Sequence, residues 1–388
     1  MKKKVTKHNI VPANKTALLL TGGGARAAYQ VGVLKAIATK LPRNCPSPFG
    51  IINGTSAGAI NATAVASYAS CFHLGVKKLE WVWKNFSTDQ VYHSDLRHVF
   101  GHLFSNILGS FQPEHLNHSP ASLLNNQPLR TYLKNVMELK RIDKNIANGY
   151  LRALSVTASS YTSGESVAFY QAKDTIPWKR AKRCGEQSKI NIEHLMASSA
   201  IPMVFPSIKI NQAYFGDGSI HQLSPLSPPI HLGANKVFII GVDQPIDNKY
   251  LGFQPHYPGI SSIAGHLLDT IFTDTLHSDI ERLERVNRTV SLLPARARGK
   301  HQELKRVETF VINPSKNFNA IACEHYDKMP FAIKMILRLI GVKAHSESSL
   351  TSYLLFERSY TRHLIEIGYQ DGLNQIDEIL AFLDIECQ

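Results

Sequence analysis

A serine flanked by two nearby glycines is the clearest candidate catalytic residue in this sequence. The stretch GTSAG, from Gly54 to Gly58, fits the pattern G-x-S-x-G and follows an apolar run at 49–54. In that pattern a strand turns sharply into a helix, the serine is held in a strained backbone, and only glycine leaves room on either side. A merely tight turn would also use glycine. The spacing makes Ser56 a candidate nucleophile.

An aspartate between glycines, Asp217 in FGDGS, is the candidate base. Aspartate in such a place is usually a turn residue, but a serine nucleophile needs a base, and a glycine-flanked loop can bring a carboxylate close to a hydroxyl. Burial beside apolar residues would raise the pKa of Asp217 and make it a better base. In the order Ser…Asp…His, a histidine after Asp217 would instead act as the base. No candidate for this role has a distinguishing local pattern; the candidates are His221, His231, His256, His266 and His277.

A third glycine site, LLLTGGGARAAYQ, leads from an apolar run into a helical pattern with Arg26 in its first turn. Glycines let the backbone turn and present N–H groups, and the start of a helix adds positive potential, so the site could bind a phosphate or an oxyanion. A dinucleotide fold would need an acidic residue at the end of the next strand, which here ends in NGTS. The Lys and Ser/Thr of a phosphate-binding loop are missing too.

No metal or cofactor is predicted. The chain has 17 histidines, and five of them form a loose group: His93, His98, His102, His115 and His118. This group lacks a regular metal-ligand spacing such as HExxH.

The net charge of +13 favours an acidic partner. The positive charge is concentrated in the N-terminal tail and in the stretch 281–306. Nucleic-acid binders usually interleave such charge with aromatic residues, and 281–306 has none. We therefore expect no nucleic acid, and an anionic membrane surface as partner. No motif indicates a protein activator.

The sequence shows no segment that would cross a membrane. No run reaches the roughly 18 apolar residues of a membrane-spanning helix, and the apolar run after the basic start is too short for a secretory signal. The five cysteines are scattered, odd in number and without a CxxC pair, which is typical of reduced thiols. We expect a cytoplasmic protein that associates peripherally with membranes.

Strand-like and helical runs alternate along most of the chain, which predicts an α/β fold with a mainly parallel sheet. The predicted strands are 16–20, 49–54, 153–159, 166–171, 207–210, 236–242 and 309–313. The predicted helices are 27–40, 58–84, 122–139 and 262–287, and the chain beyond 325 is helical throughout. We divide it into a basic tail (1–15), a catalytic α/β domain (16–316) and a C-terminal helical extension packed on that domain (317–388).

Two amphipathic segments could contact lipid. The segment 99–111 has large apolar residues at helical spacing and no acidic residue, so it could be a core helix, a lid or an acyl groove. The segment 329–343 places Phe331, Ile336 and Leu339 near one side and Lys334 and Arg338 on another. Such a helix packs on a protein core or lies in a membrane interface.

Taken together, GGGARAAYQVGVLKAI, GTSAGAINA and ASSAIPMVFPSIKINQAYFGDGS resemble the patatin-like phospholipase family from about residue 16 to residue 243. The resemblance implies a three-layer α/β/α fold and a Ser–Asp dyad that needs neither histidine nor metal. Ser56 would be the nucleophile and Asp217 the base. Gly22, Gly23, Gly24 and Ala25 would form the oxyanion hole, with Arg26 supporting the turn. The family usually has glycine or alanine after Asp-Gly, whereas this chain has Ser219.

The activity that this resemblance implies is lipid acyl hydrolysis of the phospholipase A or lysophospholipase type, on phospholipid or lysophospholipid substrates. Acyl transfer would use the same acyl-enzyme with a different acceptor. A catalytically silent lipid- or phosphate-binding protein would have no need for both Ser56 and Asp217.

Overall fold

The computed structural model describes residues 15–93, 122–174, 177–245, 260–270, 275–292, 305–339, 341–343 and 346–385. The candidate lipid-contacting segment 99–111 lies outside these ranges, as do almost all of the basic tail and part of the basic stretch 281–306.

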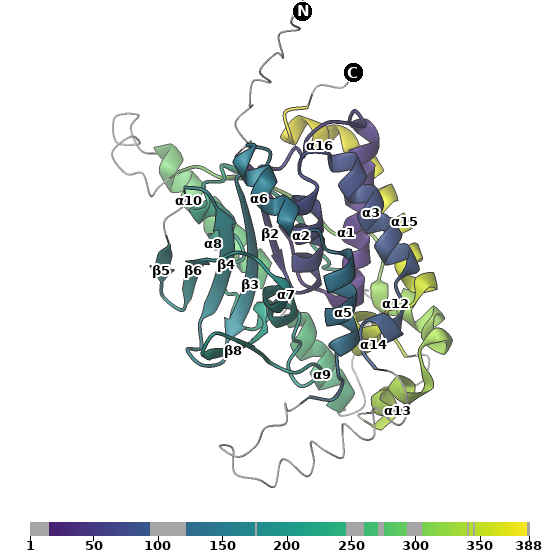
Figure 1. The fold of residues 1–388 in the computed structure, drawn as a ribbon. Helices are drawn as coiled ribbons and strands as arrows, with labels where there is room; N and C mark the ends of the chain where they lie inside the picture. Colours follow the sequence, from purple (N-terminus) through teal and green to yellow (C-terminus); the bar gives the residue numbers. More distant parts are fainter. Residues whose placement is uncertain are drawn as a thin grey trace, which may run out of the picture.

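A mixed, mostly parallel sheet forms the centre of the described structure (Figure 1). Its main path runs in the order β10-β9-β1-β2-β3-β4-β6-β5, with β8 paired to β3 and β7 to β8. The five strands from β10 to β3 are parallel to one another, whereas β4 and β8 run antiparallel to β3. The strands are β1 Thr16–Leu20, β2 Ile51–Thr55, β3 Ala153–Ser160, β4 Ser166–Ala172, β5 Trp178–Arg180, β6 Arg183–Gln187, β7 Ile208–Ile210, β8 Ala213–Asp217, β9 Lys236–Ile240 and β10 Glu308–Ile312.

Helices cover both faces of the sheet, so the three-layer α/β/α architecture is confirmed. Alternate residues of β1 enter opposite cores: Leu18 and Leu20 pack on one face, Ala17 and Leu19 on the other. The first face carries α1 Ala28–Lys40, α2 Ala57–Ser67, α3 Phe72–Asn85, α5 Gln127–Val136, α6 Lys140–Ala147 and α7 Ile192–Ser198. The second carries α8 Ser227–His231 and α10 Thr275–Leu292.

The C-terminal part of the chain is helical, as predicted. It comprises α12 Phe318–Glu324, α13 Phe331–Leu339, α14 Ser349–Leu354, α15 Arg358–Asn374 and α16 Ile376–Phe382. α15 lies directly against α1, where a Cβ on Gly32 would come within 2.1 Å of the Ile365 carbonyl oxygen. This close approach requires glycine. The division of the chain between 316 and 317 stays a prediction.

The structure differs from several of the predicted elements. The predicted helix 58–84 is two helices, α2 and α3, separated at 68–71. The predicted helix 262–287 is helical over α9 Ile260–Asp269 and over α10, and residues 271–274 between them lie outside the described ranges. The strands β5, β6 and β8 were not predicted. In α13 the buried residues are Ala332, Ile333, Ile336 and Leu337, whereas Phe331 and Leu339 are exposed, so the apolar residues predicted to share one side of this helix divide between core and surface.

Candidate active site

Ser56 occupies a sharp turn between β2 and α2. Its backbone has φ 56° and ψ −131°, outside the range that L-residues prefer. A Cβ on Gly54 would lie 2.4 Å from the Gly58 carbonyl oxygen, and one on Gly58 would lie 2.4 Å from the Leu20 and Thr21 carbonyl oxygens. Both flanking positions therefore require glycine, and the turn holds the serine where the strand ends.

Asp217 lies beside Ser56, at the end of β8. The Ser56 hydroxyl donates a hydrogen bond to Asp217 Oδ2 at 2.5 Å, and the Ser219 N–H donates to Asp217 Oδ1 at 3.0 Å. Asp217 is completely buried and Ser56 is 1% exposed. A Cβ on Gly218 would lie 2.1 Å from the Thr157 carbonyl oxygen, so this glycine also has no room for a side chain. The two candidate residues, 161 positions apart, thus meet in one buried contact.

Burial raises the pKa of Asp217 from its ordinary value of 3.8 to about 6, because the charged carboxylate loses its hydration. The hydrogen bonds from Ser56 and Ser219 favour the ionised form and oppose this effect. The result is a carboxylate more basic than one in water, as expected from the sequence.

Two further residues hold the turn, and sequence reasoning did not identify them. The Ser56 N–H donates to Ser198 Oγ at 2.9 Å, and the Ser198 hydroxyl donates to the Thr157 carbonyl oxygen at 2.6 Å. The Thr55 hydroxyl donates to Gln222 Oε1 at 2.9 Å. Ser198 lies within the segment ASSAIP that carries the family resemblance, which was its only signal; nothing in the sequence marks Gln222.

The glycine turn lies next to this dyad. Gly24 lines the same cavity as Ser56. It has φ +54°, and a Cβ there would lie 2.4 Å from the Tyr353 carbonyl oxygen. The Arg26 N–H donates to the Gly23 carbonyl oxygen at 3.0 Å, and the helical turn η1 begins at Gly24 and ends at Ala27. The first N–H groups of a helix have no acceptor within it, so those of Gly24 and Ala25 can receive an anionic oxygen.

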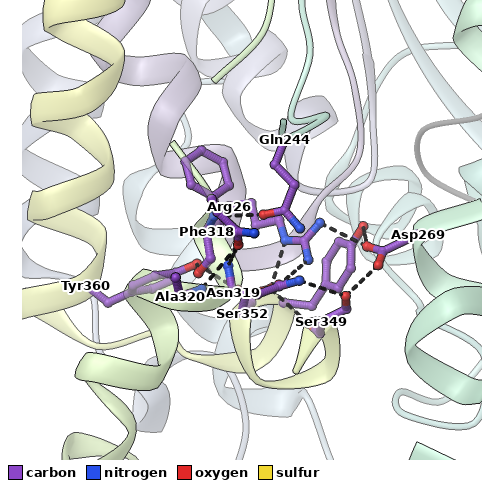
Figure 2. A network of polar contacts seen from close by, with 11 residues as sticks. Arg26, Gln244, Asp269, Phe318, Asn319, Ala320, Ser349, Ser352 and Tyr360 are labelled. Atoms are coloured by element: carbon purple, nitrogen blue, oxygen red, sulfur yellow. Dashed lines mark hydrogen bonds and ion pairs between the residues drawn. The ribbon is translucent and has the colours of Figure 1, made fainter. Parts of the chain in front are cut away.

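Gly22 and Gly23 complete the path from β1 to this turn. Both are buried, and a Cβ on Gly23 would lie 2.8 Å from Val242 Cγ2. The side chain of Arg26 is buried and held by residues of α9, α12 and α14 (Figure 2). Its position beneath the turn fits the supporting role expected of it, but the sequence did not indicate these partners.

An apolar cavity begins at Ser56 and continues along α2. It contains about 900 Å³ of empty space, including its opening to solvent. Its walls come from α2, α3 and α5, with Ile201, Phe205 and Phe356 closing the sides. A hydrocarbon chain would be excluded from water there, so the cavity suits an apolar substituent attached to the group that Ser56 attacks.

The histidines considered as bases have other surroundings. The backbone N–H of His221 donates to Ser159 Oγ, and its buried ring nitrogen Nδ1 has no hydrogen-bond partner among the described residues. His231 Nδ1 lies 2.8 Å from the Ser227 carbonyl oxygen. His277 pairs with Asp243 at the surface, His266 is exposed, and His256 lies outside the described ranges. Across the described residues, no group of three or more His, Cys, Asp or Glu side chains could hold a metal ion. No helix within the same ranges is both long and apolar enough to cross a bilayer.

Comparisons with known proteins point to one family. Residues 18–230 match the sequence profile described as "Patatin-like phospholipase". Two curated proteins, both named "Patatin-like phospholipase domain-containing protein 7", from Rattus norvegicus and Mus musculus, are 39% and 38% identical to the chain over 72 residues. This stretch is 19% of the present chain and 5% of each relative, so the chain spans only a small part of the relatives it matches.

Solved structures give remote matches. VipD from Legionella pneumophila is 13% identical with a TM-score of 0.36, covering 95% of this chain and 67% of that one. Human GIVD cytosolic phospholipase A2 is 11% identical with a TM-score of 0.43, covering 97% and 60%. The type III effector ExoU is 13% identical with a TM-score of 0.34, covering 95% and 53%. Likenesses of this size support no conclusion about function.

Proposed function

The chain belongs to the patatin-like phospholipase family, whose members are ester hydrolases, and we propose that it is a lipid acyl hydrolase of the phospholipase A or lysophospholipase type. Ser56 is the proposed nucleophile and Asp217 the proposed base. One observation carries this proposal: a serine in a strained strand-to-helix turn donates a 2.5 Å hydrogen bond to a buried, basic carboxylate. This pair lies at one end of an apolar cavity.

The reaction begins when Ser56 Oγ attacks the ester carbonyl carbon and its proton passes to Asp217. The ester C–O bond then breaks, and the leaving alcohol takes the proton from Asp217. A water molecule attacks the resulting acyl-enzyme and gives a proton to the same carboxylate. The free fatty acid leaves, and the proton returns to Ser56. No step in this sequence requires a metal or a cofactor.

The negative charge that develops on the carbonyl oxygen needs donors already in place. The proposed donors are the backbone N–H groups of the glycine turn from Gly22 to Ala25. Losing one such donor costs roughly 3–4 kcal/mol of transition-state stabilisation in other hydrolases. A glycine turn has no side chain that would stand between these N–H groups and the substrate.

The cavity along α2 would hold the acyl chain. Apolar burial contributes about 0.8 kcal/mol per methylene group, so a long chain would bind strongly there. Acyl transfer remains an alternative, since another alcohol could replace water as the acceptor. A silent lipid-binding protein would also use the cavity, but it would gain nothing from the basic pKa of Asp217.

We further propose that α13 contacts an anionic membrane surface. Phe331 and Leu339 on this helix are 62% and 74% exposed, and Lys334 and Arg338 lie between them in sequence. Changing both apolar residues to serine should weaken sedimentation with vesicles that contain anionic lipid, whereas the same change at Leu292, an 84% exposed residue of α10, should not. Vesicle binding that does not change with anionic lipid content, with salt concentration or with these substitutions would refute membrane contact through α13.

Fatty-acid release from mixed phospholipid vesicles tests the proposed activity. We expect release by the wild-type chain and a loss of roughly 10³-fold or more in Ser56→Ala and in Asp217→Asn. Matched controls are Ser163→Ala and Asp174→Asn, which change the same residue types at exposed turns. The lipid consumed would identify the substrate.

Two results would contradict the proposal. Equal release by wild type and Ser56→Ala would exclude Ser56 as the nucleophile. Release that survives Asp217→Asn would assign the base to another residue.

A further inference from the structure

Arg26 connects the glycine turn to parts of the chain that lie far away in sequence. The residue is 1% exposed. Its guanidinium donates to Asp269 Oδ1 of α9 at 3.1 Å, to Asn319 Oδ1 of α12 at 2.8 Å and to Ser352 Oγ of α14 at 2.9 Å. Figure 2 shows the three acceptors around the guanidinium. Two of the three, Asn319 and Ser352, belong to the C-terminal helices.

The acceptors are also bonded to one another. The Ser352 hydroxyl lies 2.8 Å from Asn319 Oδ1, and Asn319 Nδ2 donates to Ser349 Oγ at 3.2 Å. The Ser349 hydroxyl donates in turn to Asp269 Oδ2. Each acceptor is therefore held in place by a second bond (Figure 2), and the guanidinium meets a fixed arrangement of oxygen atoms.

Tyr353 adds two contacts between α14 and the turn. Its ring centroid lies 3.9 Å from Arg26 Cζ, a stacking distance that favours the cation. Its backbone carbonyl oxygen leaves no room for a Cβ on Gly24. The C-terminal helices thus touch the turn at Gly24 and again at Arg26.

The charge of Arg26 makes these contacts costly to remove. A guanidinium has five N–H donors and keeps its charge, so a buried one must find acceptors in the protein. The one carboxylate, Asp269, is 31% exposed, and the remaining acceptors are neutral. Removing a neutral acceptor leaves a buried N–H unpaired, and the side chain must then shift to find another partner.

The backbone of Arg26 is part of the turn that lines the cavity at Ser56. The Arg26 N–H closes that turn by donating to the Gly23 carbonyl oxygen at 3.0 Å, and Gly24 lines the cavity at Ser56. An ångström of misplacement near a reacting group can cost roughly 10²-fold in rate.

We propose that Asn319 and Ser352 are positioning residues for the oxyanion-binding turn. Through Arg26, the C-terminal helices set the direction of the Gly24 and Ala25 N–H groups. These helices therefore contribute to the geometry of the active site. The proposal rests on the proposed function, because it takes these N–H groups to face the oxyanion.

The test compares Asn319→Ala and Ser352→Ala with the wild-type chain of 388 residues. The matched control is Asn374→Ala, an exposed position at the end of α15. A conservative variant, Asn319→Asp, keeps an oxygen that can accept from Arg26. Two quantities are measured: kcat and KM on a soluble ester, and deuterium exchange of the backbone amides in residues 21–28.

We expect each alanine variant to lower kcat by roughly 10- to 100-fold, with KM little changed and faster amide exchange in residues 21–28. Asn319→Asp should recover most of kcat, and Asn374→Ala should match wild type. Because the two alanine variants lie on different helices, misfolding of one leaves the other to decide.

Unchanged kcat with unchanged exchange in a folded alanine variant would overturn the proposal. So would a rise in KM at constant kcat, which would mean a role in substrate binding. If the wild-type chain hydrolyses no ester, the proposed function fails, and the exchange measurement still decides whether the C-terminal helices hold the turn.

Discussion

Asp217 is more basic than an aspartate in water because the fold removes it completely from solvent. Its pKa is raised to about 6, with the hydrogen bonds from Ser56 and Ser219 limiting the rise. Only the ionised carboxylate can take the proton from Ser56. The residue that makes the proposed chemistry feasible therefore also sets its pH dependence.

Hydrolysis of a soluble ester should lose rate on the acidic side of about pH 6. Below this pH, kcat/KM should fall about tenfold per pH unit as Asp217 becomes protonated, and above it the rate should level off. A rate profile from pH 4 to 8 measures this. An inflection near the ordinary pKa of an aspartate, about 4, would show that burial does not tune this group.

The same pKa predicts a loss of stability as pH rises. The folded chain holds the Asp217 proton more tightly than the unfolded chain, so this residue favours folding below pH 3.8, and the benefit disappears as pH rises through about 6. Between pH 4 and 7.5 the free energy of unfolding of wild type should fall by about 2–3 kcal/mol relative to Asp217→Asn. Urea unfolding of both proteins tests this; a difference that is independent of pH would contradict it.

The sequence predicted the nucleophile and the base, but not the residues that hydrogen-bond to the nucleophile turn and to the strand before it. Ser56 and Asp217 were proposed as partners from glycine patterns, and the structure brings them within hydrogen-bond distance. Ser198 and Gln222 could not be predicted in the same way. Both act through single hydrogen bonds to β2 or the turn after it, and a lone serine or glutamine has no spacing that reveals such a bond.

Among the elements, the break between α2 and α3 shapes the cavity. The sequence predicts one helix over 58–84, because no glycine or proline interrupts it before Gly75. The end of α2 is instead capped by a residue of another helix. Asn145 of α6 donates to the Ala66 and Ser67 carbonyl oxygens at 2.9 and 3.0 Å. The chain then turns back as α3, and the cavity forms beside the two helices.

The strand that carries Asp217 was also missed. β8 contains Gly216 and ends at Asp217, two residue types that strands disfavour. It forms because its residues pair with β3, from Ala158 to Ser160. Sequence patterns do not record that kind of long-range pairing.

Filling the cavity should change the preferred chain length. Ala64 lines it about 12 Å along α2 from Ser56, at 1.5 Å of helix rise per residue. Ala64→Phe should lower kcat/KM for palmitoyl esters and spare butyryl esters, which end before the new ring. Ala147→Phe, at an exposed position of α6, is the control. Equal losses for both esters would place the acyl chain outside this cavity.

For the whole molecule, the C-terminal helices complete the core. A Cβ on Gly368 of α15 would lie 2.1 Å from the Tyr29 carbonyl oxygen of α1, and Phe382 of α16 packs against Phe238 and Phe310 of the sheet. The sequence predicted a C-terminal helical extension packed on the catalytic domain, but helical patterns do not show which surfaces such helices cover. These contacts favour a single cooperative unit.

A chain that ends at residue 316 should therefore lose the compact fold. We expect residues 1–316 to show no cooperative thermal transition and no esterase activity, because α1 loses its cover and Arg26 loses two acceptors. Circular dichroism melting of the truncated chain and of the 388-residue chain measures this. A folded and active 1–316 fragment would show that the helices are dispensable.

The central claim is that Ser56 carries the acyl group during turnover. The direct measurement is the mass of the protein quenched within the first turnovers on an activated long-chain ester, followed by identification of the modified peptide. An acyl group on Ser56 in wild type, and none in Ser56→Ala, is the predicted result. Turnover with the acyl group on another residue, or at an equal rate in Ser56→Ala, would contradict the account.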